Sequence, residues 1–298
     1  LKVALSGDAG DELFGGYNRY FWGPRIWRRL SWMPQTVRAG IGAALSSIPV
    51  ETWDTISRPL LAGVFGSRGI SRIGEKLHKL SESIRAAASM EEMYKSLVTG
   101  WHDPSAVVLG LDNVTGSGIA LDDPLPVEGA TTAELRMMYW DSVTYLPDDI
   151  LCKVDRAAMA CGLETRVPFL DHRVATLAWR LPLEMKIRGG EGKRVLRQVL
   201  HRHVPKQLID RAKIGFGIPV GDWLRGPLRE WAEDLLRESR LREEGCFRAE
   251  VVSRIWNEHL SGRRDHTVRI WTVLMFQAWL ASLSRDSSGC AGDALPSR

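Results

Sequence analysis

The chain has 298 residues, of which 44% are hydrophobic, so it can bury a sizeable core in one large domain or two small ones. Its formal net charge of +4 is mild and its basic residues are interleaved with acidic ones, which argues against a nucleic-acid partner. No apolar stretch is long enough to span a bilayer, and the four cysteines lack metal-ligand spacing. We therefore expect a protein of the reducing cytoplasm, with no membrane partner and no structural zinc.

The first predicted element is a short, buried parallel strand near residues 2–5. It leads into Ser-Gly-Asp-Ala-Gly-Asp-Glu at residues 6–12, a turn of small residues and three carboxylates that a helix is expected to follow. Small residues at a strand-to-helix turn let a ligand approach the backbone closely. Carboxylates there repel a bare phosphate unless Mg²⁺ or another cation lies between them. The turn indicates half of a nucleotide site, and we expect the other half before residue 1.

Helical patterns dominate the rest of the chain. Residues 109–129 interrupt them, because this segment is rich in Gly, Asp and Pro and has no period. We interpret it as a long exposed loop, either a variable surface connection or a mobile segment over the active site. Apolar spacing before this loop predicts helices over 17–30, 36–45, 70–88 and 91–99.

After the loop, start and stop signals define the helices. Thr131 and Glu134 have capping-box spacing, and Pro147 is followed by two acids suited to a first helical turn. Gly162 is suited to a helix C-terminus and Asp171 to the start of the next helix. These signals predict helices over 131–143, 147–162, 171–181 and 192–203, an extended connection over 164–170, three or four later helices, and a disordered tail over 285–298.

One strand and about ten helices make this chain predominantly α-helical, within an α/β fold class. A lone strand needs neighbours to satisfy its backbone groups, and we expect them in sequence that precedes residue 1. We assign residues 1–284 to one domain portion and 285–298 to the tail.

Two further clusters carry charged residues suited to chemistry. In the first, Asp149, Lys153 and Arg156 are spaced four and three apart, so on one helix they share a face. In the second, Lys213 precedes a glycine-rich loop at 215–217, which places a cation on a flexible support. Ordinary salt bridges on a helix surface are an alternative interpretation of the first cluster.

Four motifs occur in a fixed order and together are more specific than any one alone. They are Ser-Gly-Asp-x-Gly-Asp-Glu-Leu-Phe-Gly-Gly-Tyr at 6–17, Asp-Arg…Gly-Leu-Glu-x-Arg-Val-Pro-Phe-Leu-Asp at 155–171, Gly-Lys-x-x-Leu-Arg at 192–197 and Lys-x-Gly-Phe-Gly-x-Pro at 213–219. From residue 1 to about 280, the chain resembles the ATP-dependent synthetase domain of the glutamine-hydrolysing asparagine synthetases.

The resemblance implies the α/β fold of the PP-loop ATP pyrophosphatases, which is adenine nucleotide α-hydrolase-like. It also implies that the glutaminase domain and the Ser-Gly-Gly-x-Asp-Ser pyrophosphate loop belong to upstream sequence. We therefore expect this fragment alone to be inactive. The resemblance allows a homodimer in the full-length form.

The implied reaction uses ATP and Mg²⁺. The side-chain carboxylate of aspartate becomes β-aspartyl-AMP with release of pyrophosphate, and ammonia derived from glutamine then gives asparagine and AMP. Asp11 matches the family's Mg²⁺-binding acid. Asp8 stands where the family has an acid, often Glu, that handles the incoming ammonia, and a carboxylate there can accept a proton during attack. The nucleotide-binding turn comprises Ser6, Gly7, Gly10, Asp11 and Glu12.

Lys213 matches the family's catalytic lysine, which stabilises negative charge on the α-phosphate in the transition state. The resemblance places a substrate and phosphate pocket at Lys153, Asp155, Arg156, Glu164 and Arg166. For Glu164, pairing with Arg166 or a neighbour to fix the loop is an alternative. Lys193 and Arg197 are explained as readily by solvated charge on a helix as by function.

Two other functions stay open. A related synthetase or amidotransferase could activate another carboxylate. The β-lactam-forming members of the fold typically carry Tyr where Asp8 stands, so the acid favours ammonia as acceptor. The chain could also be a non-catalytic helical remnant, although the presence of both Asp11 and Lys213 argues against it.

Overall fold

The computed structural model describes residues 2–56, 73–111, 131–209 and 218–289. The chain forms two compact units. The first comprises Leu1–Gln35, Ala87–Lys95 and Thr115–Gly215, and the second comprises Thr36–Ala86, Ser96–Val114 and Phe216–Arg298. Each unit is therefore built from segments that are far apart in sequence.

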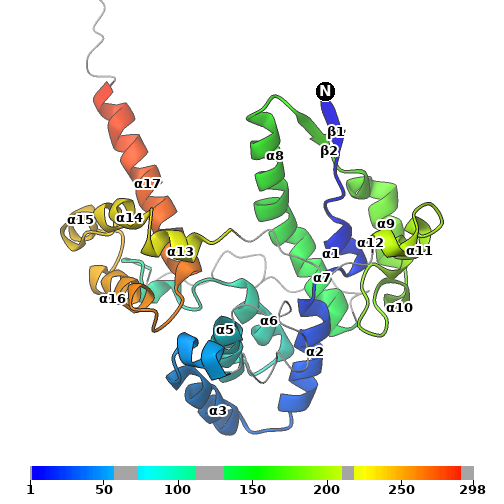
Figure 1. Cartoon of the computed structure of the whole chain (residues 1–298), viewed down its shortest axis with the longest axis horizontal. Helices are drawn as coiled ribbons and strands as arrows, with labels where there is room; N and C mark the ends of the chain where they lie inside the picture. The colour runs from blue at the N-terminus through cyan, green and yellow to red at the C-terminus, as the bar shows by residue number, and fades with distance from the viewer. Residues whose placement is uncertain (1, 57–72, 112–130, 210–217, 290–298) are drawn as a thin grey trace, which may run out of the picture. The chain divides into compact units, whose positions relative to one another are not determined.

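The first unit contains both described strands and most of the predicted site. Its elements, labelled in Figure 1, are β1 (Val3–Leu5), α1 (Gly10–Phe14), α2 (Arg19–Leu30), the start of α6 (Met90–Val98), α7 (Ala133–Val143), a π-helical turn (Leu146–Leu151), α8 (Cys152–Met159), β2 (Glu164–Arg166), a 3₁₀ turn (Pro168–Leu170), α9 (His172–Arg180), α10 (Leu183–Lys186), α11 (Arg194–Leu200) and α12 (Lys206–Ile209).

The second unit is helical in the residues that the structure describes. It contains α3 (Gln35–Ser47), α5 (Ile73–Ala86), a 3₁₀ turn (Pro104–Ala106), α13 (Val220–Arg225), α14 (Arg229–Leu235), α15 (Glu238–Glu244), α16 (Ala249–Leu260) and α17 (Thr267–Gly289). Five helices thus follow residue 218, rather than the three or four expected. Residues 285–289 belong to α17 instead of the expected tail, and the rest of that tail, like most of the predicted loop at 109–129, lies outside the described residues.

The two strands pair in parallel, with Val3 opposite Glu164 and Leu5 opposite Arg166. Figure 1 shows them side by side, with α8 leading into β2. One neighbour of the first strand therefore lies within this chain, whereas we expected its neighbours before residue 1. Residues 164–166 of the expected extended connection form that neighbouring strand. The expected burial of the first strand was wrong, because Leu5 is 76% exposed at the surface of this small sheet.

Local capping signals explain several helix boundaries. The Asp171 side chain accepts from the backbone N–H of Arg173 and starts α9, as predicted. Gly162 has φ +65°, and the N–H of Leu163 donates to the carbonyl of Ala158, a Schellman-type helix end. The cap of α7 differs by one residue, because the Thr132 hydroxyl rather than that of Thr131 accepts from the backbone.

Each unit has its own apolar core. In the first, α1 packs against the segment around Leu146 and against α9, with Leu13, Phe14 and Ala178 buried. In the second, helices α13–α17 bury a larger cluster that includes Leu224, Leu241, Val252, Ile270 and Leu274. The core of the first unit therefore holds α1, and with it the acidic turn, in a fixed place.

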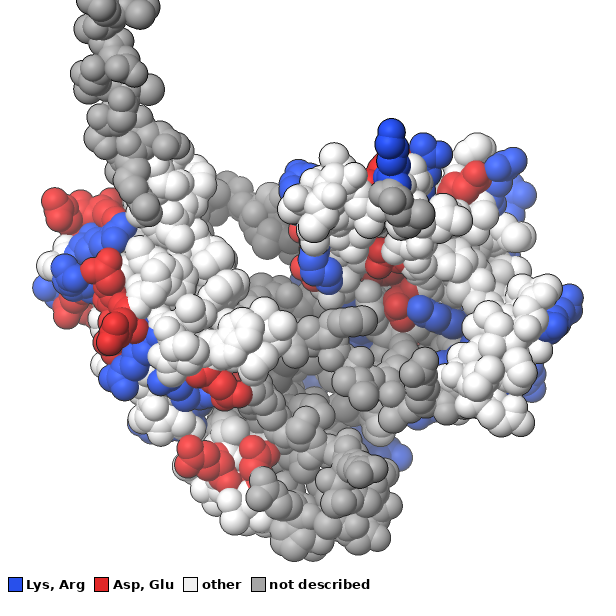
Figure 2. Space-filling model, turned by 45° about the horizontal axis from the view of Figure 1, so that its top comes forward, with Lys and Arg blue, Asp and Glu red and all other residues white. Residues whose placement is uncertain are grey.

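Charged side chains of both signs lie on the surface of the described residues. Figure 2 shows blue and red side chains interspersed on the face it presents, and ion pairs join Arg229 to Glu233 and Arg240 to Glu244 on α14 and α15. None of the described helices is both long and apolar enough to cross a membrane.

Candidate active site around the acidic turn

The acidic turn begins where the pairing of β1 with β2 ends. The backbone N–H of Ser6 donates to the carbonyl of Arg166 at 2.8 Å, which fixes the turn at the carboxyl ends of the two parallel strands. In open α/β sheets, ligands bind in the crevice beyond those strand ends. Ser6, Gly7 and Asp8 are partly or fully exposed there, and the Ser6 hydroxyl donates to the Asp8 carboxylate.

The two glycines of the turn have different surroundings. A Cβ added at Gly7 would meet nothing within 4 Å, so this position leaves open space for a ligand. A Cβ at Gly10 would lie 3.2 Å from the Phe169 ring. Gly10 is buried, and its lack of a side chain allows close packing of α1 against the 3₁₀ turn. Its nucleotide contact stays a prediction.

Asp11 lies in the first turn of α1, and its carboxylate faces a lysine from a distant part of the chain. Lys193 Nζ lies 2.8 Å from Asp11 Oδ2, and the side chains are 27% and 30% exposed. The Lys193 backbone N–H also donates to the carbonyl of Phe14 at 3.0 Å. Sequence reasoning left Lys193 open between solvated charge and function, and its contact with Asp11 makes it a functional candidate.

Glycines allow the segment with Lys193 to approach α1 closely. Gly15 has φ +72°, and a Cβ there would lie 2.5 Å from Ile187. A Cβ at Gly192 would lie 2.1 Å from the Gly15 carbonyl oxygen. Side chains at either glycine would clash, so these contacts set where Lys193 meets Asp11.

Glu12 points inward, away from the open part of the turn. It is 1% exposed, and its Oε1 accepts a hydrogen bond from the Tyr17 hydroxyl at 2.6 Å. Burial raises the pKa of Glu12 above its ordinary value, opposed in part by that hydrogen bond. Its geometry supports the placement of α1 more directly than contact with a nucleotide.

Of the basic residues in the predicted pocket, Arg166 lies next to the acidic turn. Arg166 ends β2 beside Ser6 and pairs with Glu164 at 2.8 Å. This pair confirms the simpler expectation for Glu164. Both side chains are more than half exposed, so their pairing contributes little stability.

Residues on α8 point to solvent. Lys153 and Arg156 are exposed, and Arg156 pairs with its neighbour Asp155. The shared face predicted for Asp149, Lys153 and Arg156 assumed α-helical spacing from 149 onward. A π-helical turn occupies 146–151, and its i→i+5 bonding changes the rotation per residue, so that spacing does not hold across Asp149.

Lys213 lies outside the described residues, with the rest of 210–217. Its predicted role as the catalytic lysine therefore stays a prediction.

The donors in the turn suit a magnesium ion that phosphate oxygens also hold. Mg²⁺ is commonly bound by one or two carboxylates together with substrate phosphates and water. Asp11 supplies a partly exposed carboxylate, and Gly7 leaves open space in the same turn. Among the described residues there is no group of three or more metal-ligating side chains, so the ion would depend on the nucleotide for further ligands.

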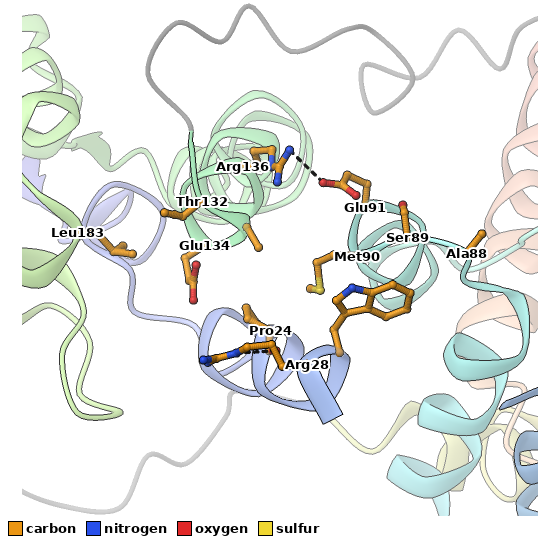
Figure 3. Close-up of a pocket in the computed structure, with 12 residues that line it drawn as sticks. Pro24, Arg28, Ala88, Ser89, Met90, Glu91, Thr132, Glu134, Arg136 and Leu183 are labelled. Atoms are coloured by element: carbon orange, nitrogen blue, oxygen red, sulfur yellow. Dashed lines mark hydrogen bonds and ion pairs between the residues drawn. The ribbon is translucent and has the colours of Figure 1, made fainter. Parts of the chain in front are cut away.

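A separate recess of about 720 Å³ lies elsewhere in the first unit (Figure 3). Trp27 and Met90 contribute apolar surface, and Arg136 pairs with Glu91 at 3.2 Å. None of its lining residues belongs to the predicted site, so the recess does not enter the functional argument.

The chain is mostly helical, with a small parallel sheet whose strand ends lead into an acidic, glycine-containing turn before a helix. Proteins of the α/β class commonly bind ligands at such strand ends. More particularly, the chain belongs to the asparagine synthase family, whose sequence model matches residues 1–281.

Bacterial relatives match most of the chain. It is 33% identical over 287 residues to a putative glutamine-hydrolysing asparagine synthetase of Mycobacterium tuberculosis, covering 94% of this chain and 39% of the relative. It is 30% identical over 282 residues to glutamine-hydrolysing asparagine synthetase 1 of Bacillus subtilis, covering 94% of this chain and 40% of the relative. The human glutamine-hydrolysing asparagine synthetase is 30% identical over 143 residues, covering 41% of this chain and 24% of that protein. The chain thus spans about two-fifths of the length of the two bacterial relatives. No solved structure matches significantly.

Proposed function

We propose that this chain is the larger part of an ATP-dependent synthetase domain that forms asparagine from aspartate and ammonia. The observation that carries the proposal is the acidic turn, where Asp8 and Asp11 lie partly exposed at the strand ends beside Lys193 and Arg166. Family membership and the printed names of the relatives support asparagine as the product.

In the first half-reaction, a side-chain carboxylate oxygen of aspartate attacks the α-phosphorus of ATP. The bond to the bridging oxygen of the β-phosphate breaks, which yields β-aspartyl-AMP and pyrophosphate. Asp11 would hold Mg²⁺ together with phosphate oxygens, and that ion supplies charge neutralisation for the leaving pyrophosphate. Lys213 is proposed to stabilise the charge on the α-phosphate.

Lys193 has a second proposed task in this step. In the described geometry it offsets the charge of Asp11 at 2.8 Å. When the nucleotide and its cation arrive, the ammonium group is close enough to turn towards phosphate oxygens, because a lysine side chain is flexible and carries three donors. In this proposal the cation replaces Lys193 as the partner of Asp11, and Lys193 offsets phosphate charge instead.

In the second half-reaction, the nitrogen of ammonia attacks the activated carbonyl carbon. One N–H proton passes to a base, and AMP leaves with the electron pair of the acyl–oxygen bond. Asp8 is the proposed base, because its carboxylate is partly exposed beside the open space at Gly7.

The proposal extends to the complete protein. Further strands and the pyrophosphate loop would complete a fold of the PP-loop pyrophosphatase class, and a glutaminase domain would supply the ammonia. We also propose a cytoplasmic location, supported by three described cysteines that are free thiols, Cys152, Cys161 and Cys246.

The test is ATP–pyrophosphate exchange by the full-length protein, measured with and without aspartate. Exchange that depends on aspartate, with asparagine formed when ammonia is added, is the expected result. Exchange with a different carboxylic acid would reassign the protein to a related amide-forming synthetase. Absence of exchange with every acid tried would overturn the proposed activity and favour a non-catalytic role.

A further inference from the structure

A fully buried carboxylate lies behind the acidic turn, at the junction of three helices. Asp141 of α7 is 0% exposed, and its Oδ2 accepts from the Tyr20 hydroxyl at 2.5 Å, while its Oδ1 accepts from the Tyr94 hydroxyl at 2.6 Å. Tyr20 belongs to α2 and Tyr94 to α6, and both are fully buried. Burying an ionised carboxylate is costly unless charge and hydrogen bonds compensate it.

Arg19 supplies the compensating charge. Its Nε donates to Asp141 Oδ2 at 2.9 Å, and a terminal nitrogen lies 2.7 Å from Oδ1. This two-point contact fixes the plane of the guanidinium group, which a lysine could not do.

The guanidinium group of Arg19 also lies against the rings of Tyr17 and Tyr145. Its central carbon lies 4.3 Å from the ring centroid of Tyr17 and 5.0 Å from that of Tyr145. The two rings meet edge to face, with their centroids 5.7 Å apart. Arg19 is 24% exposed, so this stack lies between the buried Asp141 and the surface.

The stack is connected directly to the acidic turn. The Tyr17 hydroxyl donates to Glu12 at 2.6 Å, and Glu12 follows Asp11 in α1. On the other side, Tyr145 precedes the π-helical turn that carries Asp149. A continuous set of contacts therefore runs from Asp141 through Arg19 and Tyr17 to α1.

We infer that Arg19 is a positioning residue that holds α1, and hence Asp11, at a fixed place relative to the π-helical turn. In this inference Arg19 acts through Tyr17 and Glu12 and does not contact the reacting atoms. The inference deepens the proposed function and rests on it for its catalytic meaning. The structural claim itself, that Arg19 restrains α1, can be measured without any reaction.

Three variants of the full-length protein separate this role from general support of the core. Arg19→Lys keeps the positive charge and loses the planar stack and the two-point contact. Tyr17→Phe keeps the ring on Arg19 and removes only the hydroxyl that Glu12 accepts from. Tyr94→Phe is the control for general support of the core, because it removes a fully buried hydroxyl from Asp141 while leaving Tyr17 and Glu12 in place.

The first measurement is amide hydrogen exchange of α1 and of the π-helical turn, without nucleotide. We expect Arg19→Lys to accelerate exchange in both segments roughly tenfold, and Tyr17→Phe to accelerate it in α1, as expected when local opening becomes easier. Tyr94→Phe should change α1 less than twofold. The inference would be overturned if α1 exchanged in Arg19→Lys at the wild-type rate. It would also be overturned if Tyr94→Phe accelerated exchange in α1 as much as Arg19→Lys does.

The second measurement is the KM for MgATP in pyrophosphate exchange. We expect Arg19→Lys and Tyr17→Phe to raise it by roughly tenfold, while Tyr94→Phe leaves it within twofold. If Arg19→Lys does not fold, Tyr17→Phe decides both measurements. An inactive wild-type protein would refute the proposed function alone, since hydrogen exchange would still decide whether Arg19 restrains α1.

Discussion

Lys193 and Asp11 are 182 residues apart in sequence, and their charged groups meet at 2.8 Å. The contact joins the start of α11 to the first turn of α1, and it puts a cation beside the proposed magnesium ligand. Both side chains are about 70% buried, so the ion pair is partly shielded from solvent and still accessible to a ligand. This pairing offsets the charge of one of the three carboxylates in the acidic turn before any nucleotide binds.

Replacing Lys193 should impair nucleotide binding more than folding. For Lys193→Gln in the full-length protein, we expect a rise of about tenfold in KM for MgATP, because the phosphates lose a nearby cation. The unfolding free energy should fall by only about 1 kcal/mol, as for a partly exposed ion pair. Arg194→Gln, one residue further along α11, is the control. A KM equal to that of the control would contradict the role.

Asp11→Asn should shift the magnesium dependence of the exchange reaction. The amide keeps the shape of the side chain and loses its charge, so we expect about tenfold more Mg²⁺ at half-saturation. A Mg²⁺ titration at saturating ATP measures this. Asp234→Asn, which removes a carboxylate from a surface pair with Arg237, should leave the titration unchanged. An unaltered midpoint for Asp11→Asn would remove Asp11 from the metal site.

Lys213→Ala should abolish most adenylation, about a hundredfold or more if the lysine stabilises the transition state as a charged donor. Circular dichroism and the unfolding midpoint should stay close to wild type. Equal pyrophosphate exchange in the variant and the wild type would reject the catalytic role.

Lys186 should make stability depend on pH in the alkaline range. Its side chain is fully buried, its ammonium group has no hydrogen-bond partner among the described residues, and it lies 4.8 Å from the centre of the Trp179 ring. Burial lowers the pKa of Lys186 from 10.5 to about 8. Between these values the unfolded state binds more protons, so the contribution of Lys186 to stability should rise with pH from about 8 to 10.5.

The test compares Lys186→Met with wild type by denaturant unfolding from pH 7 to 10.5. We expect the variant to be more stable at pH 7, by on the order of 1–3 kcal/mol, because no buried ammonium group has to be desolvated. The difference between the two proteins should shrink as pH rises. A constant difference across this range would show that Lys186 does not titrate as expected.

Features that depend on residues close together in the chain could be predicted from the sequence. Asp171 caps its helix, Gly162 ends the one before it, and the acidic turn follows a strand, because each depends on backbone geometry within a few residues. The order of the four motifs predicted the family, which the sequence model confirms.

Features that depend on distant contacts could not be predicted in the same way. The assignment of Glu164 to a strand required a partner about 160 residues earlier, and a three-residue strand has too few positions to show a period. The inward direction of Glu12 depends on Tyr17 and the surrounding core. Residues 146–151 form a π-helical turn, so α-helical spacing assigns the wrong faces to the residues in it.

The short ladder between β1 and β2 also has a consequence for how this domain acquires its site. Its partners are about 160 residues apart, so a large loss of chain entropy precedes the few hydrogen bonds that the ladder forms. Helices can form from local contacts much earlier. We therefore expect the acidic turn to reach its final shape late in folding, after most of the helices around it are in place, and a nascent chain to become able to bind ATP only after β2 has been synthesised.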